Sequence, residues 1–130
     1  MSVTEELKQE HRIIERMLAT LNAAAARVDK GQELPPEFFA KAVDFIRNFA
    51  DRCHHGKEED NLFPVLERHG ISRQGGPIGV MLMEHDRGRA YVRGMDEAAQ
   101  RLAVGDRAAL EAALDNACGY AELLRQHIYE

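Results

Sequence analysis

The chain has 130 residues, a formal net charge of −5 and 45% apolar residues. This length suits one domain with a hydrophobic core, so we expect a single domain over residues 1–130. No basic stripe with interleaved aromatic residues is present, so nucleic acid is not expected as a partner. No apolar run reaches the ~20 residues of a membrane span. The start lacks the apolar stretch of a signal peptide, and the 2 cysteines are too few for a disulfide framework. We therefore expect a cytoplasmic protein without a membrane partner.

The first predicted helix covers residues 3–30. Ser2 followed by Glu5 is typical of a capping box at a helix N-terminus, and Gly31 can end the helix. The apolar residues alternate in steps of four and three, which is the spacing of a bundle seam. A histidine takes one position of this seam, which reads Leu7, His11, Ile14, Leu18, Leu21, Ala25 and Val28.

The second predicted helix starts at Pro35 or Pro36, because proline suits the first helical turn. Gly70 is its predicted end. Pro64 lies inside this helix and should kink or loosen it near Asp60, because proline has no N–H to bond the carbonyl four residues earlier.

Two further helices complete the predicted fold. The third covers residues 77–102 and places His85 on its apolar seam. Asp106 caps the fourth, which continues to the last residue and places His127 at a seam position. Because the connections between these helices are short, neighbouring helices should be antiparallel. The predicted fold class is therefore all-α, as an antiparallel up-down-up-down four-helix bundle.

The second helix also carries two adjacent histidines. His54 precedes Glu58 by four residues, and His55 precedes Glu59 by the same interval. Side chains with this spacing lie one turn apart on one helix face, with Cβ atoms about 5–6 Å apart, so either pair can bind a metal ion. The seam slightly favours His55 with Glu59, but the residues alone leave both pairs open.

Inward-facing histidines on four helices predict a metal site. An unpaired polar group in an apolar core costs roughly 1–3 kcal/mol, and a shared metal ion can be the partner that these imidazoles need. Mixed imidazole and carboxylate ligands suit iron, manganese or zinc. Several carboxylates among the histidines favour two metal ions over one tetrahedral zinc ion. The alternative is a set of ordinary core histidines, each bonded to a carbonyl.

Over essentially its whole length the chain resembles the haemerythrin-like family, the His-His-Glu cation-binding domains. The most specific part is the run from His54 to Pro64, with a histidine, a glutamate four residues later, and Leu-Phe-Pro ending six residues after that glutamate. Pro64 lies six residues after Glu58, so the resemblance selects His54 and Glu58. The metal ligands that it implies are His11, His54, Glu58, His85, His127 and Glu130, with His55 and Glu59 as the alternative pair in the second helix.

The resemblance also implies the cofactor, which would be two iron ions (Fe²⁺/Fe³⁺) joined by an oxo or hydroxo bridge, with zinc and manganese as lesser alternatives. Oxygen-carrying haemerythrins have a further histidine where this chain has Arg89. The chain is therefore more similar to bacterial four-histidine proteins implicated in iron-centre repair, nitric oxide handling, or iron and redox sensing.

The implied function is that of a non-haem di-iron protein that binds or senses a small ligand, such as oxygen, nitric oxide or a small oxidant, in iron or redox stress. Turnover is not expected; an enzyme of this kind would be a di-iron oxidoreductase. The alternative function is a metal-dependent sensory or protein-interaction bundle without turnover, with a protein as its partner.

Overall fold

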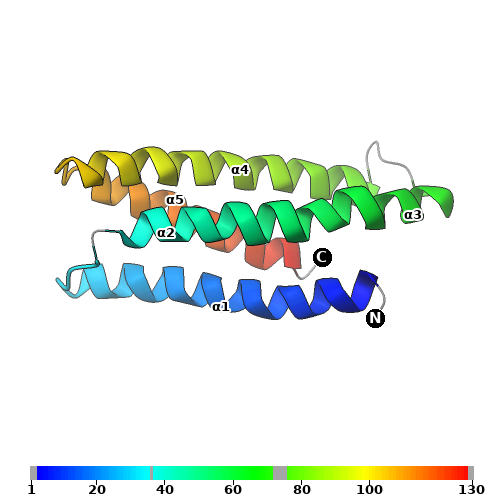
Figure 1. Cartoon of the computed structure of the whole chain (residues 1–130), viewed down its shortest axis with the longest axis horizontal. Helices are drawn as coiled ribbons and strands as arrows, with labels where there is room; N and C mark the ends of the chain where they lie inside the picture. Colours follow the sequence, from blue (N-terminus) through cyan, green and yellow to red (C-terminus); the bar gives the residue numbers. More distant parts are fainter. Residues whose placement is uncertain (1–2, 36, 72–75, 129–130) are drawn as a thin grey trace.

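The computed structural model describes residues 3–35, 37–71 and 76–128, without the side chains of residues 3, 127 and 128. The described residues form four helical rods and no strand (Figure 1). In chain order the helices are α1 (Val3–Asp29), then α2 (Phe38–Phe45), η1 (Ile46–His55), η2 (Glu58–Leu62) and α3 (Phe63–Arg68), then α4 (Gly76–Ala103) and α5 (Ala109–Ile128). None of them combines the length and the apolar character that crossing a membrane requires.

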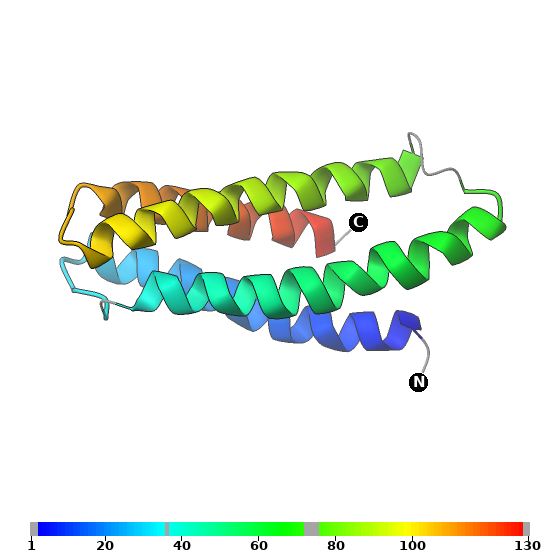
Figure 2. The same cartoon turned by 45° about the horizontal axis from the view of Figure 1, so that its top comes forward.

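The rods run alternately in opposite directions, which confirms the predicted all-α up-down bundle (Figures 1 and 2). The segments from α2 to α3 follow one another in a single rod, called the second rod below. This rod packs against both α1 and α4, and α5 also packs against both α4 and α1. Each rod thus has two neighbours, and all four enclose one core.

Helix ends follow the sequence signals closely. α1 ends two residues before Gly31, whose φ of 78° is the left-handed conformation that is common just after a helix C-terminus. The N–H of Gln32 donates to the carbonyl of Arg27, which satisfies one of the last free carbonyls of the helix. α5 begins later than predicted, because Asp106 first forms a turn in which its side chain accepts a hydrogen bond from the N–H of Ala108.

The core fills the bundle along the predicted seams. Leu7, Ile14, Leu18 and Leu21 of α1 are buried, as are the small residues that α5 presents to its neighbours. The small residues of α5 allow its backbone to approach α4 closely. The main buried cluster consists of Ile14, Leu18, Leu21, Phe39, Val43, Ile46, Ala50, Val92, Met95, Ala98, Ala99, Ala109, Ala113, Ala117, Tyr120, Ala121 and Leu124.

The middle of the second rod is wound as π-helix rather than α-helix. The N–H of Gly56, for example, donates to the carbonyl of Asp51, five residues earlier. The second π segment, η2, lies directly before α3, which has Pro64 in its first turn. The predicted loosening near Asp60 is therefore confirmed, and π-helical segments of this kind often occur at functional sites.

Candidate metal centre

The π-helical winding places two adjacent histidines in the interior of the bundle. An α-helical turn advances by 3.6 residues, so neighbouring residues normally face about 100° apart. In the wider η1 turn both His54 and His55 are buried, with 0% and 3% of their surface exposed. Glu58, at the start of η2, is also buried. The second rod therefore contributes two imidazoles and one carboxylate to the core.

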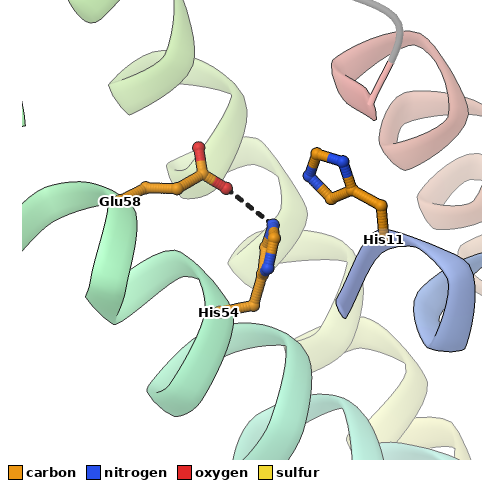
Figure 3. Close-up of side chains that lie close together, drawn as sticks. All are labelled: His11, His54 and Glu58. Carbon is orange, nitrogen blue, oxygen red and sulfur yellow. Dashed lines mark ion pairs between the residues drawn. The ribbon is translucent and has the colours of Figure 1, made fainter. Parts of the chain in front are cut away.

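One group of potential ligands joins α1 to the second rod. One ligand atom each of His11, His54 and Glu58 lies within 4.8 Å of the others. Nε2 of His54 is 2.9 Å from Oε1 of Glu58, and the His11 and His54 ring centroids are 4.6 Å apart. In Figure 3, His54 and Glu58 extend from the second rod toward His11.

A second group joins the same rod to α4. His55, Glu58 and His85 again offer ligand atoms within 4.8 Å of one another. Oε2 of Glu58 lies 3.7 Å from Nε2 of His85, and the His55 and His85 rings stack with centroids 4.0 Å apart. Glu58 belongs to both groups, and its two oxygens face different histidines. Such a carboxylate can bridge two metal ions.

Carboxylates outside these groups orient the histidines. Nδ1 of His54 lies 3.1 Å from Oε1 of Glu10, and Nδ1 of His85 lies 2.7 Å from Oε2 of Glu59. An Nδ1–H that donates to a carboxylate leaves Nε2 as an electron-pair donor directed into the site. Metal-binding histidines are commonly held by a carboxylate in this way.

Cations in turn hold these outer carboxylates. Nζ of Lys57 lies 2.7 Å from Glu10, although burial on its own would raise the pKa of that carboxyl. Hydrogen bonds from Lys57 and His54 outweigh the effect of burial and lower the pKa of Glu10. Nη2 of Arg89 lies 3.0 Å from Glu59. There too burial would raise the pKa, but hydrogen bonds from His85 and Arg89 lower it.

Asp51 is a third carboxylate of this kind. Its Oδ1 lies 3.9 Å from Nδ1 of His55 and 2.8 Å from Nη2 of Arg89. Hydrogen bonds from His55 and then from Arg89 hold the pKa of Asp51 far below its usual range. Arg89 thus links the carboxylates behind His55 and His85, and both stay ionised at neutral pH.

The arrangement at His54 fits a bound cation. Its buried Nε2 has no hydrogen-bond partner among the described residues, although Oε1 of Glu58 is 2.9 Å away. When Nδ1 donates to Glu10, Nε2 and Oε1 both present electron pairs to each other. Two such atoms repel unless a proton or metal ion lies between them, and burying an uncompensated carboxylate costs several kcal/mol. Imidazole and carboxylate donors together suit iron, manganese or zinc.

The structure brings together five of the residues named from the sequence: His11, His54, His55, Glu58 and His85. From the sequence, only one of the pairs His54–Glu58 and His55–Glu59 was expected to supply ligands. In the structure both histidines face the interior, so the choice does not arise. Glu59 lies outside both groups and bonds to His85 and Arg89 instead. Counting apolar positions in steps of three and four assumes an α-helix, and the π-helical turn changes which residues face the core. The side chain of His127, at the end of α5, and the whole of Glu130 lie outside the described residues.

Two carboxylates and one arginine that hold the histidines were not predicted from the sequence. Glu10 precedes His11 in the chain but contacts His54, 44 residues away, so local spacing gives no sign of this role. Asp51 lies four residues before His55, and this spacing on one helix face was the available signal. Arg89 was noted only as a replacement for a histidine.

Comparison with known proteins shows the family of the chain. The family model of the hemerythrin HHE cation-binding domain matches residues 2–130. Uncharacterized protein Mb2018 of Mycobacterium bovis and Uncharacterized protein Rv1995 of Mycobacterium tuberculosis are each 24% identical over 127 residues, which is 98% of this chain. The match covers 49% of each relative, so the chain spans about half their length. No solved structure gives a significant match. The chain belongs to the hemerythrin HHE cation-binding domain family.

Proposed function

We propose that this protein binds two iron ions, one on each side of the Glu58 carboxylate, and uses them to bind or sense a small ligand such as oxygen or nitric oxide. The observation that supports this most directly is the shared carboxylate. Its oxygens face His54 and His85, which belong to two different groups of ligands. One metal ion would lie among His11, His54 and Glu58, and the other among His55, Glu58 and His85.

The residues of the chain have separate tasks in this proposal. The imidazoles supply nitrogen ligands, and Glu58 supplies the bridging oxygens. Glu10 and Glu59 hold the Nδ1 protons of His54 and His85, which fixes the direction of each Nε2. Burial of His54 and Glu58 excludes water from the interior side of the site. Iron would supply reversible electron transfer to a small ligand at a coordination position that the protein leaves open.

A second candidate function is a sensory or interaction bundle without turnover. The observation that favours it is the origin of the ligands, since α1, the second rod and α4 all contribute to the two groups. Metal binding would therefore tie three rods together and stabilise the fold. A partner protein could then recognise the metal-bound form.

Elemental analysis of anaerobically purified protein tests the main proposal. We expect about two iron ions per chain, as in other di-iron bundles, and an absorption spectrum that changes on adding oxygen or nitric oxide. His54→Ala should lower the metal content. His69→Ala is the matched control, because His69 is an exposed histidine at the end of the same rod and lies outside both groups.

Either of two results would contradict the proposal: wild-type protein with neither iron nor zinc, or equal metal content in the two variants. The second candidate function makes a different prediction. It requires a large metal-dependent change in stability, with no ligand-dependent spectrum and no turnover.

A further inference from the structure

A cavity of about 250 Å³ lies between the second rod, α4 and α5. His55 and His85 form part of its lining, together with the buried ring of Tyr120. At roughly 30 Å³ per water molecule, the volume corresponds to on the order of eight waters. A molecule of a few non-hydrogen atoms therefore fits beside the candidate metal ligands.

The charges around this cavity are mainly positive. Arg47, Arg89 and Arg93 line it, against the single carboxylate of Asp51. Two of the guanidinium groups are already engaged: Arg47 lies 3.1 Å from Asp96, and Arg89 binds the outer carboxylates described above.

Arg93 differs from the other two arginines. It is exposed, and it makes no ion pair or hydrogen bond with any residue that the structure describes. Its guanidinium is planar and carries five N–H donors in a fork that matches two oxygens on one atom. Arg93 is therefore a cation at the cavity with its donors uncommitted.

We infer that this cavity binds a small planar oxyanion with two oxygens on one atom, such as a small carboxylate or nitrite, held by the fork of Arg93. The inference rests on the proposed function only in that the candidate metal ligands His55 and His85 line the same cavity. A paired hydrogen bond from a guanidinium to such an anion is stronger than a neutral one and fixes the orientation of the anion. The anion would lie next to the second group of ligands.

A titration of the full chain followed by ¹H–¹⁵N NMR tests this inference. Formate and nitrite are added separately to metal-free and to zinc-loaded protein, since zinc takes no part in redox chemistry. We expect saturable shifts in the amides of α4 around Arg93. Arg93→Ala should weaken binding by about three- to tenfold, the range for a charge-assisted hydrogen bond at a solvent-exposed position. The Arg93→Lys variant keeps the charge but loses the fork, so its anion affinity should lie between those of the wild type and Arg93→Ala.

Arg87→Ala is the matched control, because Arg87 is an exposed arginine of the same helix and does not line the cavity. Equal affinities of Arg93→Ala and Arg87→Ala, or the absence of saturable shifts in α4, would overturn the inference. Tighter binding of formate assigns the cavity to carboxylates, and tighter binding of nitrite assigns it to nitrite. If the protein takes up neither iron nor zinc but still binds anions through Arg93, the proposed function alone fails. If it takes up metal but binds no anion through Arg93, this inference alone fails.

Discussion

Glu59 is positioned to orient His85, although it lies outside both groups of candidate metal ligands. It lies 2.7 Å from Nδ1 of the histidine and is held from behind by Arg89. Carboxylates in this position fix the orientation of the ring and increase its strength as a ligand. The negative charge of Glu59, as well as its shape, should therefore contribute to metal affinity.

Glu59→Gln tests this role because it keeps the size of the side chain and removes the charge. We expect metal affinity to fall by about 10- to 100-fold, which is the usual effect of changing such a partner. Competition with a chelator of known affinity measures it. Glu97→Gln, an exposed glutamate of α4 outside both groups, is the control and should leave the affinity unchanged. Equal affinities in the two variants would show that Glu59 does not act on the site.

At the scale of single residues, the sequence predicted the candidate ligands better than the residues that contact them. Glu58 was selected by the family resemblance, against the slight preference of the seam for Glu59. His11 and His85 were predictable because each takes a seam position that an apolar residue would otherwise fill. Glu10 was not, because its contact with His54 depends on how α1 packs against the second rod. Contacts between residues far apart in the chain are set by tertiary packing, which helical periodicity does not encode.

The close contact between α4 and α5 depends on two glycines. A Cβ placed on Gly119 would lie 2.5 Å from the ring of Tyr91, and one placed on Gly94 would lie 2.4 Å from the side chain of Asn116. Both distances are far shorter than ordinary van der Waals contact. The amide of Asn116 can rotate away at the cost of its hydrogen bond to the carbonyl of Ala112, whereas the ring of Tyr91 packs against the core.

Gly119→Ala should therefore destabilise the bundle. The better helix propensity of alanine contributes about 1 kcal/mol, but overpacking against the Tyr91 ring costs about 1–3 kcal/mol. Urea denaturation measures the difference. Adding Tyr91→Ala to the same protein removes the obstacle, so the two changes together should cost less than the sum of their separate effects. Additive costs would rule out this contact as the cause.

The second rod shows where sequence periodicity stops being informative. Its length and the effect of Pro64 were predictable from proline and glycine positions. The π-helical register was not, because no residue type specifies an extra residue per turn. This register brings both His54 and His55 inside, so a choice between them based on 3.6-residue spacing could not succeed.

At the scale of the whole molecule, each ligand group connects two rods through residues that are far apart in the chain. His11 is on α1, His85 is on α4, and Glu58 lies between them on the second rod. A metal ion held by these residues would bind the folded state and not the unfolded chain. Metal binding should therefore raise the free energy of unfolding.

Thermal unfolding with and without a chelator tests this expectation. With free metal at about 100 times its dissociation constant, the gain is about 2.7 kcal/mol, which should raise Tm by several degrees or more in a chain of this size. The His54→Ala variant should lose most of the metal-dependent rise in Tm, and the His69→Ala variant should keep it. An identical Tm in loaded and chelator-treated wild-type protein would mean that the bundle does not depend on metal.

Anomalous diffraction at the iron edge, from crystals of the iron-loaded protein, tests most directly whether Glu58 bridges two iron ions. We expect two peaks about 3.5–4 Å apart, one on each side of the Glu58 carboxylate. One peak should lie near His11 and His54, and the other near His55 and His85. A single peak, or peaks away from Glu58, would contradict the claim that this carboxylate bridges two metal ions.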